Sequence, residues 1–127
     1  MKSRETALQA KRFEADEKAR KVSDLETMIR EFEAMASDLD RQVHAEEERT
    51  GVRDRLHFAY STFAKAAAQR RDNLRASASG LRSRLESAQR ERDEAMERLS
   101  QSTTVEARQQ EEIRRRRGER GDDAALR

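Results

Sequence analysis

Apolar residues recur along the first part of the chain at alternating steps of three and four. This spacing is unbroken through Val22, Leu25, Ile29, Phe32, Ala36, Leu39 and Val43. Such steps place the side chains on one narrow helical stripe, which is the seam of a coiled coil rather than the wider face of a globular helix. The pattern predicts a long helix that packs against a partner helix.

The same heptad extends in both directions and predicts a first helix over residues 1–50. Its a positions remain apolar outward to Leu8, whereas Lys11, Lys18 and Glu46 occupy the outer d positions. The predicted seam is therefore tight in the middle and polar at both ends. Thr50-Gly51 then indicates a helix stop, because glycine adopts the left-handed conformation at little cost. Residues 51–60 keep no heptad and are predicted to form a tip loop.

A second heptad predicts a helix over residues 61–113, with Ser61 as its N-cap. Its seam positions are Ala64, Ala67, Arg71, Leu74, Ala78, Leu81, Leu85, Ala88, Arg92, Ala95 and Leu99, followed by the polar Ser102, Glu106 and Gln109. Residues 114–127 begin with the run Arg114–Arg117 and keep no seam. We expect them to form a basic, frayed C-terminal tail.

Two helices joined by a short loop favour an all-α fold, a long antiparallel two-helix coiled-coil hairpin. Folding the chain near residue 55 pairs Val22 with Ala88, Leu25 with Leu85, Ile29 with Leu81, Phe32 with Ala78, and Ala36 with Leu74. Large side chains then mostly face small ones. The same register brings Lys18 near Arg92. We call the end that holds both termini the open end.

Composition supports this thin architecture. Of the 127 residues, 43% are charged and only 4% are aromatic, and proline and cysteine are absent. The lack of cysteine excludes disulfides and thiolate metal sites. Residues 1–50 hold 10 basic and 13 acidic side chains and residues 51–127 hold 18 and 13, so the halves should attract each other. No apolar run approaches the roughly 18 residues of a membrane span, and we expect a cytoplasmic protein.

The sequence offers little catalytic chemistry. Its four glycines form neither a phosphate loop nor a dinucleotide fingerprint. His44 and His57 lack a spaced set of further ligands, so we interpret them as solvated or tip-packing side chains. The run Glu46–Glu48 is interpreted as a solvated helix end. We therefore expect no enzyme, no cofactor and no metal.

Three segments are candidate binding surfaces. Leu56, Phe58, Tyr60 and Phe63 gather apolar area at the tip, where they either cap the hairpin core or contact a partner. Arg70 and Arg71 make the second helix basic just past the tip, as a solvated face or as part of that partner site. The run Arg114–Arg117 is an unstructured tail, a protein contact, or a site for nucleic acid or acidic lipid.

Several stretches resemble a known family. They are MKSRET at the start, KRFEADEKARKV, DLDRQVHAEEERTG and, most specifically, HFAYSTFAKAAAQRRDNLRASA across the tip. Together, over roughly residues 1–100, they are similar to the flagellar export protein FliJ of alphaproteobacteria. The C-terminal RRRRGERGDD lies outside this resemblance.

The resemblance implies a stalk or escort protein of flagellar type III protein export. Its partners would be the hexameric export ATPase, the cytoplasmic domain of the membrane export gate, and export chaperones. We expect the gate to contact the residues at and just past the tip, Leu56, Phe58, Tyr60, Phe63, Arg70 and Arg71. Lys11, Lys18 and Arg92 at the open end are expected to contact the ATPase, which would be the hydrolysing partner. The alternatives are a general coiled-coil scaffold or homodimer, and a basic helix that binds nucleic acid.

Overall fold

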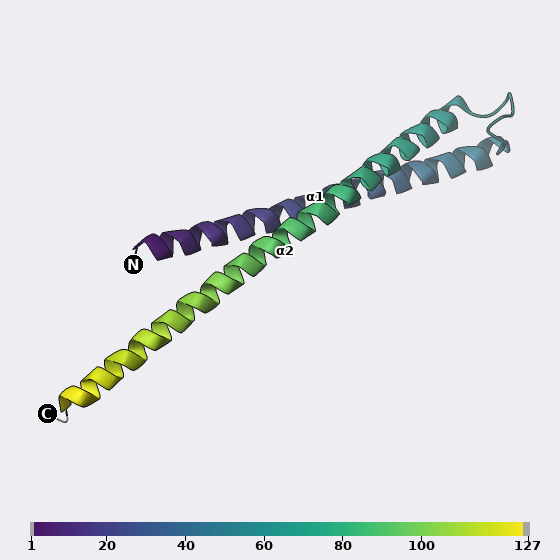
Figure 1. Ribbon diagram of the computed structural model, residues 1–127. Helices are drawn as coiled ribbons and strands as arrows, with labels where there is room; N and C mark the ends of the chain where they lie inside the picture. The colour runs from purple at the N-terminus through teal and green to yellow at the C-terminus, as the bar shows by residue number, and fades with distance from the viewer. Residues whose placement is uncertain (1, 126–127) are drawn as a thin grey trace. The chain divides into compact units, whose positions relative to one another are not determined.

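The computed structural model describes residues 2–125, with side chains described from residue 3 to residue 121. Two α-helices account for most of it, α1 at Lys2–Thr50 and α2 at Thr62–Ala125 (Figure 1). No strand occurs within residues 2–125. The helices pack against each other, which confirms the all-α helical hairpin predicted from the heptads.

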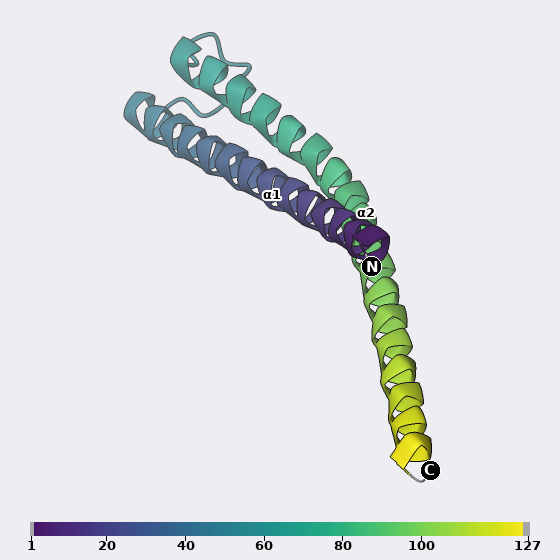
Figure 2. The same ribbon diagram turned by 90° about the vertical axis from the view of Figure 1, so that its left-hand side faces the viewer.

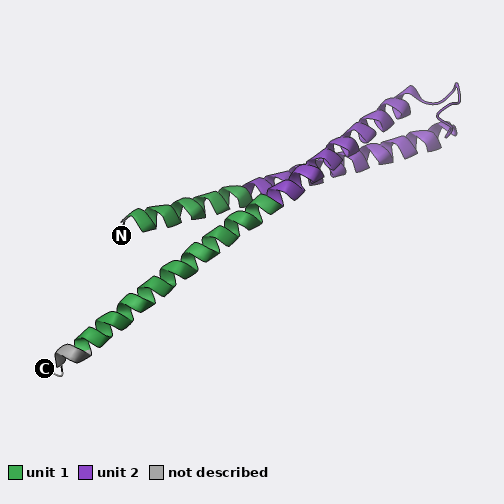
Figure 3. Cartoon of the chain, in the orientation of Figure 1, with its two compact units in different colours: residues 1–19, 90–127 green, residues 20–89 purple. Residues whose placement is uncertain are grey.

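The hairpin divides into two compact units, each containing a stretch of both helices (Figure 3). Unit 1 comprises residues 1–19 and 90–127, and unit 2 comprises residues 20–89. In unit 2 the two helical stretches lie side by side and are joined by the loop (Figure 2).

The core of unit 2 is the predicted seam. Its larger cluster contains Val22, Leu25, Ile29, Leu81 and Ala88, with Phe32 and Leu85 packed against it. A second cluster closer to the loop contains Val43, Ala67 and Ala68, with Leu39 against it. The residues of two expected pairs, Val22 with Ala88 and Ile29 with Leu81, thus lie in the same cluster.

The seam of unit 1 is polar, as the heptad predicted. Among the side chains of unit 1 that the structure describes, only Ala15 and Ala95 are buried. The Lys11 Nζ donates a hydrogen bond to the Ser102 Oγ, 2.5 Å away. The Lys18 Nζ lies 3.3 Å from the Glu91 Oε2, so its charge is paired. The lysine stems thus line the seam while their ammonium groups reach polar partners.

Ion pairs across the hairpin reflect the unequal charges of the two halves. In unit 2, the Arg71 Nη1 lies 2.6 Å from the Asp40 Oδ1, and Arg82 pairs with Glu33. In unit 1, the Arg98 Nη2 lies 3.0 Å from the Glu14 Oε1. In each of these pairs α2 supplies the arginine and α1 the carboxylate.

Both helix ends at the loop are capped as expected. Gly51 has a φ of 74°, in the left-handed region, and its N–H donates to the Glu47 carbonyl at 2.9 Å. The Ser61 Oγ accepts a hydrogen bond from the Ala64 N–H at 3.2 Å, which is the geometry of an N-cap.

The prediction for the C-terminal segment is wrong in one respect. The second helix does not end near residue 113, because α2 continues to Ala125. Residues 110–121 are all exposed, so this stretch is helical without a seam. Arginine and glutamate are good helix formers, and the pair of Glu112 with Arg116 at 2.8 Å supports the helix.

Candidate partner-binding surfaces

The tip loop is held in shape by its own hydrogen bonds. The Asp54 Oδ1 accepts from the Leu56 N–H at 3.0 Å, and the Asp54 carbonyl accepts from the His57 N–H at 3.1 Å. The His57 Nδ1 accepts from the Ala59 N–H at 3.0 Å. The side chains of Asp54 and His57 thus fix the turn by accepting hydrogen bonds from backbone N–H groups two residues further on, which is a common role of aspartate in loops.

The two most exposed large apolar side chains of the tip sit on this loop. Leu56 is 93% exposed and Phe58 is 96% exposed, and the His57 ring stacks on Phe58 with 4.7 Å between ring centroids. Neither Leu56 nor Phe58 caps the hairpin core, so that interpretation is wrong for both. Both residues belong to the loop, beyond the seam positions of either helix, so the seam does not cover their side chains.

Tyr60 does cap the core. It is 9% exposed, and its hydroxyl donates to the Glu47 Oε2 at 3.2 Å. Burial, with the hydrogen bond to Glu47, raises the pKa of the Tyr60 phenol. Glu46 likewise accepts from the Ser61 Oγ at 3.1 Å. The glutamates at this end of α1 are thus not merely solvated, because two of them join α1 to the segment that begins α2.

The two candidate arginines past the tip differ. Arg70 is exposed, whereas Arg71 is 9% exposed and is bound by Asp40 and, at 3.1 Å, by Asp72. The hydrogen bond from Arg71 lowers the pKa of the Asp40 carboxyl. Arg71 is therefore part of the buried seam, and its guanidinium is not accessible to a partner.

An exposed surface remains at the tip. Phe63 is 56% exposed, and the loop arginines Arg53 and Arg55 are exposed beside Leu56 and Phe58. We call Leu56, Phe58 and Phe63 the tip surface. Arg53 and Arg55 were not among the predicted site residues, although the two basic residues just before Leu56 were a signal in the sequence.

At the open end, the three predicted contact residues are already engaged within unit 1. Lys11 and Lys18 bind Ser102 and Glu91, and the Arg92 Nε donates to the Asp93 Oδ1 at 3.0 Å. The predicted register brings the like charges of Lys18 and Arg92 near each other. Each charge is balanced by a carboxylate, that of Glu91 for Lys18 and that of Asp93 for Arg92. All three side chains are half-buried.

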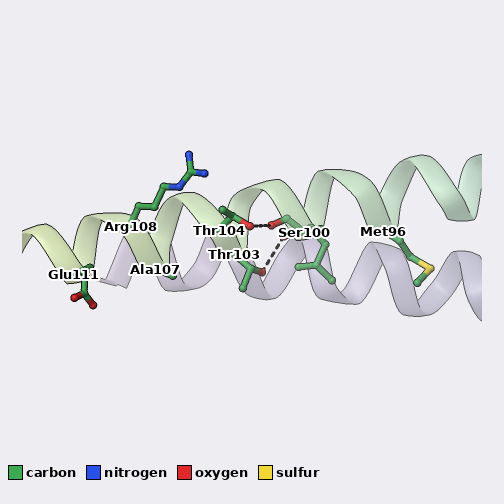
Figure 4. Close-up of a pocket in the computed structure, with 8 residues that line it drawn as sticks. Met96, Ser100, Thr103, Thr104, Ala107, Arg108 and Glu111 are labelled. Carbon is green, nitrogen blue, oxygen red and sulfur yellow. Dashed lines mark hydrogen bonds between the residues drawn. The ribbon is translucent and has the colours of Figure 1, made fainter.

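A shallow groove lies along α2 within unit 1 (Figure 4). It is lined by Met96, Leu99, Ser100, Thr103, Thr104, Ala107, Arg108 and Glu111. The Thr103 and Thr104 hydroxyls donate to the carbonyls of Leu99 and Ser100, each at 2.9 Å. These hydroxyls are thus used within the helix, and the groove offers mainly aliphatic surface.

Within the described residues, no group of three or more His, Cys, Asp or Glu side chains is placed to hold a metal ion. The His44 Nδ1 lies 3.5 Å from the Asp40 Oδ2 on the same helix, and His57 belongs to the tip turn. Neither helix, over the part that the structure describes, has a stretch long and apolar enough to cross a membrane.

Comparisons of the chain with protein-family models, with curated proteins and with solved structures give no match.

Proposed function

We propose that this chain is a non-enzymatic helical-hairpin protein of flagellar type III export, which links the export gate to the hexameric export ATPase and to export chaperones. The observation that carries the proposal is the tip surface. Exposing the apolar side chains of Leu56 and Phe58 to water is unfavourable, and a partner that covers them would remove this unfavourable contact with solvent. The strongest stretch of the family resemblance, residues 57–78, begins in this loop.

The tip suits binding for a physical reason. Its turn is fixed by Asp54 and His57, so a partner need not order the loop on binding. A preordered anchor loses less conformational entropy, and large apolar side chains are favoured anchors. We therefore propose the tip surface as the contact with the cytoplasmic domain of the export gate.

The test compares Leu56→Ala/Phe58→Ala with the wild type in binding to the purified gate domain. We expect affinity to fall at least tenfold while thermal stability is unchanged, since both side chains are outside the core. Phe13→Ala is the matched control, because Phe13 is an aromatic residue of α1 that is 66% exposed. Equal loss in the control, or none in the tip variant, would remove the tip from the gate contact.

The open end is proposed as the contact with the ATPase, through Lys11, Lys18 and Arg92. Because Lys11 and Lys18 also join the two helices of unit 1, simple charge reversal mixes two effects. The exchange Lys18→Glu/Glu91→Lys separates them, since it preserves the pair across the hairpin while changing the charge at each surface position.

If Lys18 contacts the ATPase, the exchanged chain should lose its stimulation of ATP hydrolysis although its melting temperature is retained. If stimulation persists, Lys18 acts only within the hairpin. A chain that binds neither gate nor ATPase, yet assembles with other helical proteins, would support the alternative of a general coiled-coil scaffold.

A further inference from the structure

Beyond the seam, α2 gathers three of its arginines on one side, while Arg115 lies among the glutamates on the other side. With about 100° of rotation per residue, Arg116, Arg117 and Arg120 project within about 60° of Ile113, where the seam would continue, whereas Arg114 lies about 100° away from it. Three glutamates lie toward the opposite side, at positions 111, 112 and 119. We call Ile113, Arg116, Arg117 and Arg120 the arginine face.

The arginine face has little to neutralise it. Arg116 pairs with Glu112, but no ion pair involves Arg117 or Arg120 among the residues that the structure describes. Ile113 is 47% exposed at the next seam position after Gln109. A helix face of this kind favours an anionic partner that also offers apolar area.

The chain itself contains a surface with that chemistry. On α1, Asp24, Met28, Glu31, Met35 and Asp38 follow one another at steps of four and three, on a narrow stripe away from the seam. Met28 and Met35 are 41% and 40% exposed, and the three carboxylates are exposed. We call these five residues the acid–methionine stripe.

Two of its carboxylates are available. Neither Asp24 nor Glu31 forms an ion pair within the described part of the chain, while Asp38 bonds to Arg41 on its own helix. The stripe is about 21 Å long from Asp24 to Asp38, and the arginine face is about 10 Å long from Ile113 to Arg120. One arginine face therefore fits within one stripe.

We propose that the arginine face of one copy of this chain docks on the acid–methionine stripe of a second copy. The carboxylates alternate with the methionines and lie about 10 Å apart along the stripe, within reach of the long side chains of Arg116, Arg117 and Arg120, while Ile113 meets a methionine. A nucleic acid would satisfy the arginines but would leave Ile113 and the methionines in water. Self-association of this kind is independent of the flagellar proposal, because it requires only this chain.

The experiment measures the mass of the full chain by sedimentation over a range of concentrations. The wild type should associate, and the association constant should fall at least tenfold when salt is raised to several times the physiological level, because salt screens exposed pairs. An acidic-face variant, Arg116→Glu/Arg117→Glu/Arg120→Glu, and a basic-stripe variant, Asp24→Lys/Glu31→Lys, should each remain monomeric. Circular dichroism verifies that both stay helical.

Mixing the two variants gives the decisive measurement. The acidic face of one then meets the basic stripe of the other, and the native stripe of the first meets the native face of the second, so the mixture should associate. A matched control, Arg53→Glu/Arg70→Glu/Arg84→Glu, changes as many exposed arginines elsewhere and should associate like the wild type.

Three results would overturn the proposal. They are a wild type that stays monomeric at low salt and high micromolar concentration, an acidic-face variant that associates normally, and a mixture of the two variants that does not associate. Binding of duplex DNA by a chain that remains monomeric would assign the arginine face to nucleic acid instead.

Discussion

Three leucines at different depths allow a direct test of the seam. Leu81 is 7% exposed in the main cluster of unit 2, Leu85 packs half-buried against the same cluster, and Leu56 is 93% exposed in the loop. Replacing each by alanine removes the same atoms from three environments. The change in the free energy of unfolding should therefore follow burial alone.

The magnitudes follow from that burial. Leu→Ala costs about 2–5 kcal/mol in protein cores. A two-helix seam covers Leu81 on few sides, so we expect about 2–3 kcal/mol for Leu81→Ala by the same measure, and roughly half of that for Leu85→Ala. Leu56→Ala should stay within about 0.5 kcal/mol of the wild type, as for other surface changes.

Urea unfolding followed by far-ultraviolet circular dichroism measures all three. With a slope of about 1–3 kcal/mol per molar urea, Leu81→Ala should lower the midpoint by about 1–2 M. The slopes should match the wild type, since the variants expose similar surface on unfolding. Equal midpoints for Leu81→Ala and Leu56→Ala would refute the seam, and so would a wild-type midpoint in Leu81→Asp, which buries an unpaired charge.

Other changes test the caps and the ion pairs. In the folded chain the pKa values of Asp40 and Glu46 lie below their ordinary values of 3.8 and 4.5. The stability that these carboxylates contribute is therefore fully present above the ordinary values and is lost as the pH falls through the lower folded values. Acid unfolding scans should show this loss. Gly51→Ala should destabilise the chain by about 1 kcal/mol because of the positive φ, whereas Gly80→Ala, with open space around its Cβ and an ordinary helical φ, should stabilise it by a similar amount in thermal melts. Ser61→Ala should cost about 1 kcal/mol through the lost N-cap, and a melt that is unchanged would count against that cap.

The seam was predictable because it depends only on spacing. Every heptad position from Leu8 to Glu46, and from Ala64 to Gln109, is buried or half-buried. Even Arg71, a charged residue among apolar seam positions, is buried as its heptad position predicts. Strict periodicity leaves a helix one side to bury, so the sequence sufficed for the fold of the hairpin.

The candidate sites were less predictable, for two reasons. The course of an irregular loop depends on specific hydrogen bonds, such as those of Asp54 and His57, so the projection of Leu56 and Phe58 had no periodic signal. The continuation of α2 was missed because the absence of a seam was interpreted as the absence of a helix. Helix formers extend a helix beyond its packing partner once a packed stretch has nucleated it.

In a seam one side chain wide, each helical turn packs only against the turns next to it and the turn that faces it. The free energy needed to separate the two helices at any point therefore depends on the contacts at that point. In the described part of unit 1 the buried seam residues are alanines, and Leu8 and Leu99 are only half-buried. The seam there also depends on hydrogen bonds such as Lys11 to Ser102, which water replaces at a cost of about 1 kcal/mol each. In unit 2 the same length of helix buries Val22, Leu25 and Ile29. Backbone amides of unit 1 should exchange with deuterium first. A protein that inserts between the helices of unit 1 then needs far less free energy than one that separates those of unit 2.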